Sequence, residues 1–164
     1  MKRLNTLLLF IFFPCMLLAQ EVIETPEYFF QQGINSGVEG NFAQSVEFFS
    51  KAIEKRPGYA EAYLYRGIAK NETGDFEGAI RDLNITIELD PAFSDQAHFF
   101  RGNSNAGLYR FREAIDDYTL AIYKNPDYLA FFKRGMANYY QKEYHRAIPD
   151  FDITIRLNPD YEEA

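Results

Sequence analysis

The chain has 164 residues and a formal net charge of −7, from 24 acidic and 17 basic side chains. This acidic balance argues against nucleic-acid binding, because phosphates would be repelled rather than neutralised, and the aromatic content of 17% is too high for a disordered chain. The single Cys15 cannot close an internal disulfide. The two histidines, His98 and His145, lie far apart with no cysteine nearby, so the sequence predicts no zinc or other metal site.

The N-terminal stretch is typical of a secretory signal peptide covering residues 1–19. A short basic start precedes a nearly continuous apolar run, which Pro14 interrupts before it reaches the roughly 20 residues of a membrane span. We predict cleavage after Ala19, which leaves 24 acids against 15 bases and no cysteine. The mature chain is then expected to be exported, periplasmic or secreted in a bacterial envelope, with no membrane attachment. Lipidation of Cys15 and an uncleaved anchor are the alternatives.

After a short polar leader at residues 20–25, helical patterns follow one another in pairs. In the second pair, apolar residues from Ala79 to Ile87 recur on one helical face, Asp75 is placed to cap the start, and Pro91 ends the helix. Pro149 falls in the second turn of the last pattern and predicts a kink or a late helix start there. The predicted helices cover residues 26–39 and 42–55, 60–73 and 76–89, 95–108 and 111–124, and 128–141 and 144–157.

The four pairs are copies of one unit. Each copy has a Gly, a small residue twelve positions later, an apolar residue sixteen positions later and a Pro twenty-four positions later. The distance from Pro to the next Gly varies from nine to eleven residues, so the helical hairpin is the constant packing object and the connecting loops absorb the variation. The four sets are Gly33, Ser45, Phe49, Pro57; Gly67, Ala79, Leu83, Pro91; Gly102, Ala114, Tyr118, Pro126; and Gly135, Ala147, Phe151, Pro159.

This frame resembles the tetratricopeptide repeat family, and the resemblance covers residues 26–159. A mid-helix Gly costs about 1 kcal/mol against Ala, so four such glycines indicate close helix approach. The resemblance implies an all-α, right-handed α-solenoid of eight helices. It also implies a non-enzymatic scaffold for protein–protein interaction, with no cofactor. The expected repeats span residues 26–59, 60–94, 95–127 and 128–160, with residues 161–164 beginning an unfinished fifth.

An Arg precedes an Asp by sixteen residues in the last three units, and we predict that each pair bridges the two helices of its unit. The pairs are Arg66 with Asp82, Arg101 with Asp117, and Arg134 with Asp150. In the first unit both positions change together, to Gln32 and Phe48. An Arg row that reads an acidic ligand is the alternative, but an Arg that always brings its own Asp favours the structural interpretation.

No catalytic set is evident. His98 occupies a position where the other units carry aromatic residues, which indicates packing, and His145 is expected to face solvent. There is no reactive cysteine, phosphate-binding glycine loop or paired histidine on a helix, so the sequence predicts neither an enzyme nor a cofactor. The glycosylation patterns at Asn71 and Asn84 are short enough to arise by chance.

The family resemblance implies that the first helices line a concave groove. The positions three before, one after and four after each Gly form a stripe that is unusually apolar and aromatic, and such stripes mark binding sites for proteins and peptides. Packing between units is the alternative role. The stripe has no Lys or Arg, so a carboxylate clamp of the family type is not expected. The predicted binding residues are Phe30, Ile34, Leu64, Ile68, Asn71, Phe99, Asn103, Phe132, Met136 and Tyr139, and the stripe also contains Gly37 and Ala106.

The last helix raises a second hypothesis. Residues 158–161 repeat the sequence that opens the fourth unit, and no further unit follows in the 164 residues. Repeat arrays need a terminal cap with a polar outer face, and without one Ile148, Phe151 and Ile155 would be partly exposed. Either a homo-oligomer assembles through this helix, which is the alternative to groove binding, or the chain is a shortened member of a longer family.

Overall fold

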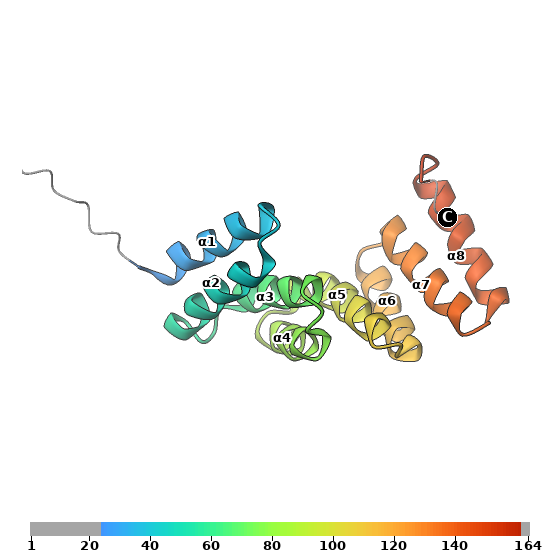
Figure 1. Ribbon diagram of the computed structural model, residues 1–164. Coiled ribbons are helices and arrows are strands. Elements are labelled where there is room, and N and C mark those ends of the chain that lie inside the picture. The colour runs from blue at the N-terminus through green and yellow to red at the C-terminus, as the bar shows by residue number, and fades with distance from the viewer. Residues whose placement is uncertain (1–23, 162–164) are drawn as a thin grey trace, which may run out of the picture.

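The computed structural model describes residues 24–161, which form an elongated array of helical hairpins (Figure 1). Eight α-helices and a short 3-10 segment, η1 (Pro91–Phe93), make up this part of the chain. The predicted signal peptide and residues 162–164 lie outside the described residues. The helices are α1 (Pro26–Val38), α2 (Phe42–Lys55), α3 (Ala60–Glu72), α4 (Phe76–Leu89), α5 (Ser94–Gly107), α6 (Phe111–Lys124), α7 (Tyr128–Tyr140) and α8 (Tyr144–Leu157).

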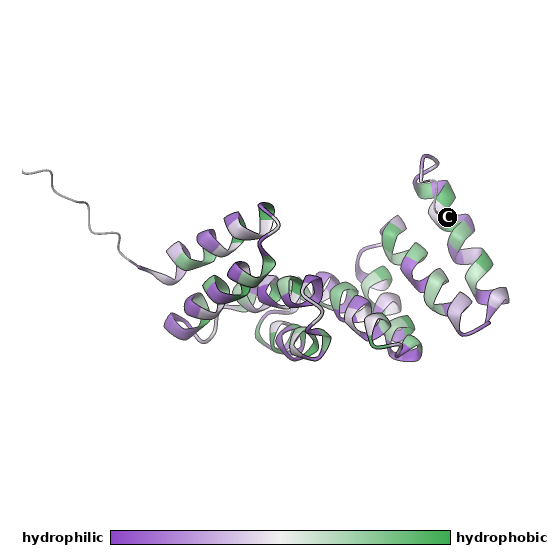
Figure 2. Cartoon of the chain, viewed as in Figure 1, coloured by the Kyte–Doolittle hydropathy of each residue, from purple (hydrophilic) through white to green (hydrophobic). Residues whose placement is uncertain are grey.

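The helices pack in antiparallel pairs, which confirms the predicted all-α repeat architecture. Each first helix contacts the second helix of its own unit, and each second helix contacts the first helix of the next unit. Figure 2 shows apolar and polar residues alternating around the helices, as expected where one stripe of each helix faces a neighbour. The core is therefore a row of small clusters between successive helices rather than one central core.

The constant spacing of each unit comes from a side chain that lies against a glycine, which is an aromatic ring in units one, three and four and Leu83 in unit two. A Cβ placed on Gly102 would lie 2.7 Å from Cε1 of Tyr118, and one on Gly135 would lie 2.8 Å from Cε1 of Phe151. These distances are too short for carbon atoms, so the glycine is what allows the two helices of a unit to approach. The prediction that the mid-helix glycines serve close packing is confirmed at these positions.

Polar side chains begin several of the helices. Thr25 accepts a hydrogen bond from the Tyr28 amide at the start of α1, and Asp75 accepts one from the Gly78 amide at the start of α4. The N-cap predicted at Asp75 is confirmed. The predicted late start at Pro149 is wrong, because α8 begins at Tyr144 and runs through the proline. The kink proposed as the other outcome stays a prediction.

The hairpin turns share a residue with positive φ, seven positions after each unit's glycine. Gly40 (φ 77°) and Gly74 (φ 82°) take this position in the first two units, whereas Tyr109 (φ 59°) and Lys142 (φ 64°) take it in the last two. A left-handed backbone costs a residue with a Cβ about 1–2 kcal/mol. The third and fourth turns are therefore strained where the first two are not.

The three predicted Arg–Asp bridges all form. Arg66, Arg101 and Arg134 each donate through Nε and Nη2 to the Asp sixteen residues later, with Nη2–Oδ1 distances of 2.7, 2.5 and 2.7 Å. The three carboxylates are at most 5% exposed. Because each arginine is held by its own buried carboxylate, the row of arginines is not free to read an acidic ligand.

Candidate functional site

An open hollow of about 800 Å³ lies on the face formed by the first helices of units two, three and four. Its volume falls within the usual range of ligand sites. Its lining includes several aromatic rings and the small residues Ala106, Gly107 and Ala137. The hollow is lined by Asn71, Glu72, Phe76, Asn103, Ala106, Gly107, Tyr109, Phe111, Tyr118, Phe132, Lys133, Met136, Ala137 and Tyr140.

Four of the ten predicted binding residues line this hollow, namely Asn71, Asn103, Phe132 and Met136. Tyr139 lies outside it and is 51% exposed. Leu64 is fully buried in the cluster with Leu83 and Ala97, so its prediction as a binding residue is wrong: it packs between units.

The remaining predicted residues lie outside the hollow and are partly buried. Phe30 packs against the rings of Phe49, Tyr59 and Tyr65, and Phe99 packs against Phe100 and Tyr118. Ile68 joins the cluster around Leu83, and Ile34 is half-buried. Phe30, Ile68 and Phe99 are therefore engaged in packing, which was the alternative role considered for this stripe.

Two asparagines hold the polar part of the hollow in place. Asn71 donates from Nδ2 to Oγ of Ser104 at 2.7 Å and to the carbonyl of Phe100 at 3.3 Å, which ties α3 to α5. Asn103 accepts from the Tyr118 hydroxyl at 2.8 Å. Burial, and next the neighbouring Asp117, raise the pKa of Tyr118 above its usual range, so this hydroxyl stays a donor. The acceptor oxygen of Asn103 is thus engaged, whereas its amide nitrogen donates no hydrogen bond among the described residues.

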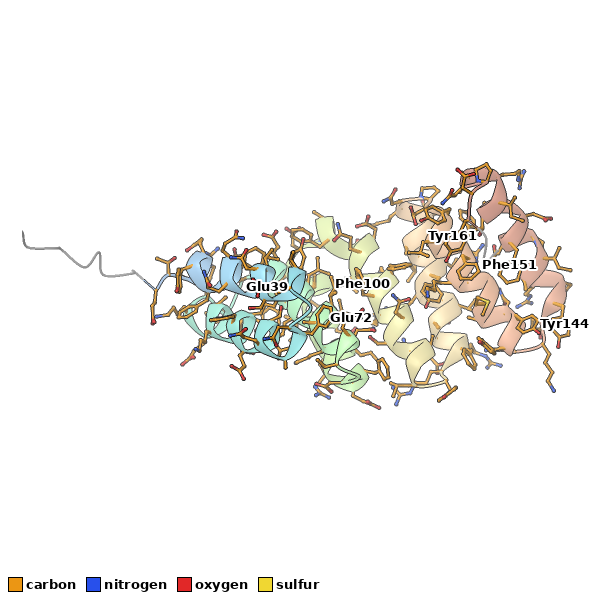
Figure 3. The ribbon with its side chains drawn as sticks, turned by 45° about the horizontal axis from the view of Figure 1, so that its top comes forward. Glu39, Glu72, Phe100, Tyr144, Phe151 and Tyr161 are labelled. Atoms are coloured by element: carbon orange, nitrogen blue, oxygen red, sulfur yellow. The ribbon has the colours of Figure 1, made fainter. Side chains whose placement is uncertain are left out.

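The hollow has one cation and one anion. Lys133 on α7 and Glu72 at the end of α3 both line it, and neither forms an ion pair within residues 24–161. Lys133 was missed by the sequence analysis, because it lies two positions before the unit's glycine and so beside the predicted stripe. The lining therefore includes one charge of each sign. Figure 3 shows Glu72 in the middle of the array.

A connected path of five aromatic rings, here called the aromatic rim, runs along the edge of the hollow. Successive ring centroids are 6.1, 5.2, 6.0 and 5.4 Å apart, and the second pair is stacked with an interplanar angle of 17°. Four of the five side chains are at least half exposed, with exposed fractions from 50% to 82%. The aromatic rim consists, in order, of Tyr109, Phe111, Tyr140, Tyr139 and Tyr144.

Part of the aromatic rim could have been predicted from the sequence. The first residue of every second helix is aromatic, at Phe42, Phe76, Phe111 and Tyr144. Phe76 reaches into the next unit, where a Cβ on Gly107 would meet its ring at 2.6 Å, and Phe111 stacks on Tyr140 in the unit after its own. A comparison of this position across the four copies would have placed aromatic rings at the hollow.

The described residues give no sign of a metal centre or membrane span. No group of three or more His, Cys, Asp or Glu side chains within residues 24–161 could hold a metal ion. Over the same range, no helix has the length and apolar character needed to cross a bilayer. His98 lies among packed side chains, as predicted, with its side chain 14% exposed.

Comparisons with known proteins point to repeats of one kind. Residues 32–92 match the model of the tetratricopeptide repeat. Mouse serine/threonine-protein phosphatase 5 is 32% identical over 87 residues, which are 53% of this chain but 17% of the phosphatase, so the likeness spans a small part of that protein. An uncharacterised protein of Methanocaldococcus jannaschii is 34% identical over 59 residues, which cover 36% of this chain and 69% of the relative.

Solved structures share the fold over most of the chain. MamA from Desulfovibrio magneticus RS-1 has a TM-score of 0.77 with 20% identity, covering 84% of this chain and 77% of MamA. The first tetratricopeptide domain of Spaghetti (RPAP3), solved with the HSP90 peptide SRMEEVD, has a TM-score of 0.67 with 18% identity, covering 72% of this chain and 96% of the domain. Domains of this kind are typically non-catalytic modules for protein–protein interaction. With its four helical hairpins and its repeated Gly-to-Pro frame, the chain belongs to the tetratricopeptide repeat family.

Proposed function

We propose that the protein is a non-enzymatic scaffold that binds an extended peptide, or an extended segment of a partner protein, in the hollow. The observation that carries this proposal is the aromatic rim. Most of its rings are solvent-exposed and lie beside one open hollow. Exposed aromatic clusters next to a concave surface are typical of binding sites, and Tyr is a favoured anchor residue.

The strained turn at Tyr109 supports the same surface. Tyr109 has a positive φ of 59° where the first two units have glycine, and its side chain is 82% exposed. It contributes nothing to the core that would offset the backbone strain. Strain of this kind persists where a side chain serves a role other than stability, and here the side chain stands at the edge of the hollow.

A peptide fits this surface better than a nucleic acid. Aromatic rows also stack bases, but single-stranded nucleic acids are held by positively charged grooves that follow the phosphates. The hollow has one lysine against one glutamate, and the chain has a net charge of −7. The peptide-bound Spaghetti domain has the same fold, which makes a peptide ligand compatible with this architecture.

The proposal predicts that binding depends on the exposed tyrosines. Displayed random peptides would be selected on the full chain, and their affinities measured for a Tyr109→Gly/Tyr140→Ala variant. Losing two aromatic anchors is expected to weaken binding about thirtyfold or more. Tyr109→Gly relieves the turn, so the variant should keep its fold.

Tyr123→Ala is the matched control, because Tyr123 is 87% exposed on α6 and does not line the hollow. It should leave the affinities unchanged. Selected peptides that bind the double variant as tightly as the unmodified chain would place the binding surface elsewhere, and a selection that enriches no peptide would contradict the proposed ligand class.

Self-association through α8 is the second candidate function. It rests on a different surface, where Ile148 and Ile155 are 59% and 44% exposed. Export to the periplasm or the medium likewise stays a proposal that rests on residues 1–19 alone.

A further inference from the structure

The three interfaces between successive units follow one rule. In each, the first helix of a unit packs on the second helix of the unit before it, and it has small residues five positions before and two positions after its glycine. Ala62 packs against Ile53, and Ala137 packs against Tyr118 of the preceding unit. All six small residues are at most 3% exposed: Ala62, Ala97 and Ala130, then Ala69, Ser104 and Ala137.

An arginine crosses each of these interfaces. Besides holding its own aspartate, Arg66 donates from Nη1 to Oγ of Ser50 at 3.1 Å. Arg101 donates in the same way to Oδ1 of Asn84 at 2.6 Å, and Arg134 to Oγ1 of Thr119 at 3.1 Å. The three acceptors share one position in the unit, two residues after the aspartate or its equivalent. The incoming helices therefore share the pattern Ala-x-x-x-Arg-x-x-Ala, with Ser as the last residue in unit three.

The outer face of α8 presents the receiving half of this interface. Ile155 occupies the position of Ile53, which is 8% exposed beneath α3, yet Ile155 is 44% exposed. Ile148 occupies the position of Ile115, which packs in the cluster around Ala137, yet Ile148 is 59% exposed. Among residues 24–161, no helix lies on this face. Figure 3 shows Phe151 and Tyr144 on this last helix of the array.

In the earlier units, one position on the second helix accepts a hydrogen bond from the arginine of the next unit, and on α8 this position is an aspartate. Asp152 stands where the earlier units have Ser50, Asn84 and Thr119, and its carboxylate has no ion pair or side-chain hydrogen bond among the described residues. A charged acceptor binds a guanidinium more strongly than a hydroxyl or an amide does. The open face is thus matched to a cationic residue on the incoming helix.

The N-terminal helix of a second copy does not fit this face. At the two positions where the incoming helices have Ala or Ser, α1 has Tyr28 and Asn35, and at the arginine position it has Gln32. The larger side chains would hold α1 away from α8, and no cation would reach Asp152. Head-to-tail stacking of copies is therefore not expected.

We propose that the outer face of α8, built from Tyr144, Ile148, Asp152 and Ile155, docks an α-helix of another protein that carries the pattern Ala-x-x-x-Arg-x-x-Ala. The face continues the three interfaces already formed within the chain, and Asp152 adds a charge complementary to the arginine. The small residues let the helix approach as closely as α3, α5 and α7 approach their predecessors. This face shares Tyr144 with the aromatic rim, but none of its four residues lines the hollow, and the docking proposal does not depend on the peptide-binding proposal.

The test uses a helix that already has the pattern. A fluorescein-labelled, hydrocarbon-stapled peptide of residues 127–141 contains Ala130, Arg134 and Ala137, and its binding to the full chain would be followed by fluorescence anisotropy. Saturable binding is expected. Ile148→Glu should weaken it about tenfold or more, because a charge would be buried in the interface. Asp152→Asn should weaken it about threefold, as expected for a partly exposed ion pair.

Matched controls separate this surface from the others. Leu120→Glu and Tyr123→Ala, at exposed positions of α6 outside the hollow, should leave the affinity unchanged. A peptide with Ala130→Tyr and Ala137→Asn, which imitates α1, should not bind. Circular dichroism would verify that each variant is folded, and Ile155→Lys would replace Ile148→Glu if the latter is not.

Three results would overturn the proposal: no binding of the stapled peptide, binding that neither Ile148→Glu nor Ile155→Lys weakens, or equal binding of the α1-like peptide. Sedimentation velocity on the same samples tests the one other occupant of this face, a second copy of the chain. A dimer of the unmodified chain that Ile148→Glu dissociates and that the stapled peptide does not displace would show that a second copy covers the face instead.

Discussion

His98 is the residue whose protonation matters most to the packing of unit three. Its Nδ1 lies 3.1 Å from Nη2 of Arg101 and 3.4 Å from Oδ1 of Asp117. Burial, and next the charge of Arg101, lower the pKa of His98 below its ordinary value, while Asp117 opposes the shift and Lys124 adds weakly to it. At neutral pH the ring is therefore uncharged, and because the guanidinium can only donate, Nδ1 accepts the hydrogen bond from it.

This shift predicts a pH-dependent stability. Below about pH 6.5, His98 of the unfolded chain takes up a proton that the folded chain resists, so the free energy of unfolding falls as the pH falls. The change should be smaller in His98→Phe, which restores the aromatic residue found in units one and four. Urea denaturation between about pH 7 and pH 5 would measure it. Equal pH slopes for the two proteins would show that His98 does not titrate differently on folding.

Within a helical hairpin, the buried Arg–Asp pair fixes the position of one helix against the other. Asp117 is held by Arg101 and also accepts from Nδ2 of Asn105 at 2.9 Å. Lys70 has the corresponding role in unit two, where its Nζ lies 2.8 Å from Asp82. In unit four the same position is Asn138, whose Oδ1 is buried without a partner. In units two, three and four the Arg and Asp of the bridge are the same, but the residue three positions after the glycine, which lies beside the bridge, differs: Lys70, Asn105 and Asn138.

Removing one member of the buried Arg–Asp pair should lower the free energy of unfolding far more than breaking an exposed ion pair. Arg101→Gln leaves Asp117 buried with its charge uncompensated, and the expected loss in unfolding free energy is about 3–5 kcal/mol. Arg110→Gln breaks only the exposed pair with Glu77 and should cost at most about 1 kcal/mol. Thermal and urea denaturation of the two variants would measure both values.

A double variant tests the cause of that loss. Arg101→Gln/Asp117→Phe reproduces Gln32 and Phe48 of the first unit, so it should recover much of the stability lost in Arg101→Gln alone. A double variant as unstable as the single one would show that the buried charge is not the source of the loss.

The helices and the bridges could be predicted because their causes lie within one unit. Gly102 and Tyr118, or Arg134 and Asp150, are sixteen residues apart in the same hairpin, and comparison of four copies exposes such pairs directly. The hollow could be predicted only in part, since it depends on contacts between units. Ile68 and Met136 both lie one position after the glycine of their unit, yet Ile68 packs in the cluster around Leu83 and Met136 lines the hollow. Tertiary packing decides whether such a residue is buried or lines the hollow, and the periodicity of the local sequence does not contain that information.

Across the whole molecule, stability should be distributed along one dimension. Each unit contacts only its neighbours, so the array behaves as a sum of unit stabilities and interfaces. Units two and three have neighbours on both sides. The outer face of α8 has none among the described residues, and α8 also contains Pro149, which removes one backbone hydrogen bond.

Hydrogen exchange should therefore reveal a gradient along the chain. Backbone amides of α8 are expected to exchange faster than those of α4 and α5, because local opening at an open end disrupts fewer interfaces. Hydrogen–deuterium exchange with mass spectrometry would resolve the helices. Addition of the stapled peptide should slow exchange in α8 and leave α1 unchanged. Uniform protection of all helices would contradict the one-dimensional picture.

The sixteen-residue separation of each Arg from its Asp has a consequence for how such a chain can grow. Because both charges lie inside one hairpin, a duplicated unit brings its own counter-ion, and inserting it neither strands a buried charge nor adds one. Only the hydrogen bond from the arginine to the preceding unit must form anew at the junction, and in this chain Ser, Asn and Thr each accept that bond. The unit of packing is thus also a unit that a gene duplication can copy whole, which leaves surface positions such as Tyr109 and Asp152 free to diverge from copy to copy.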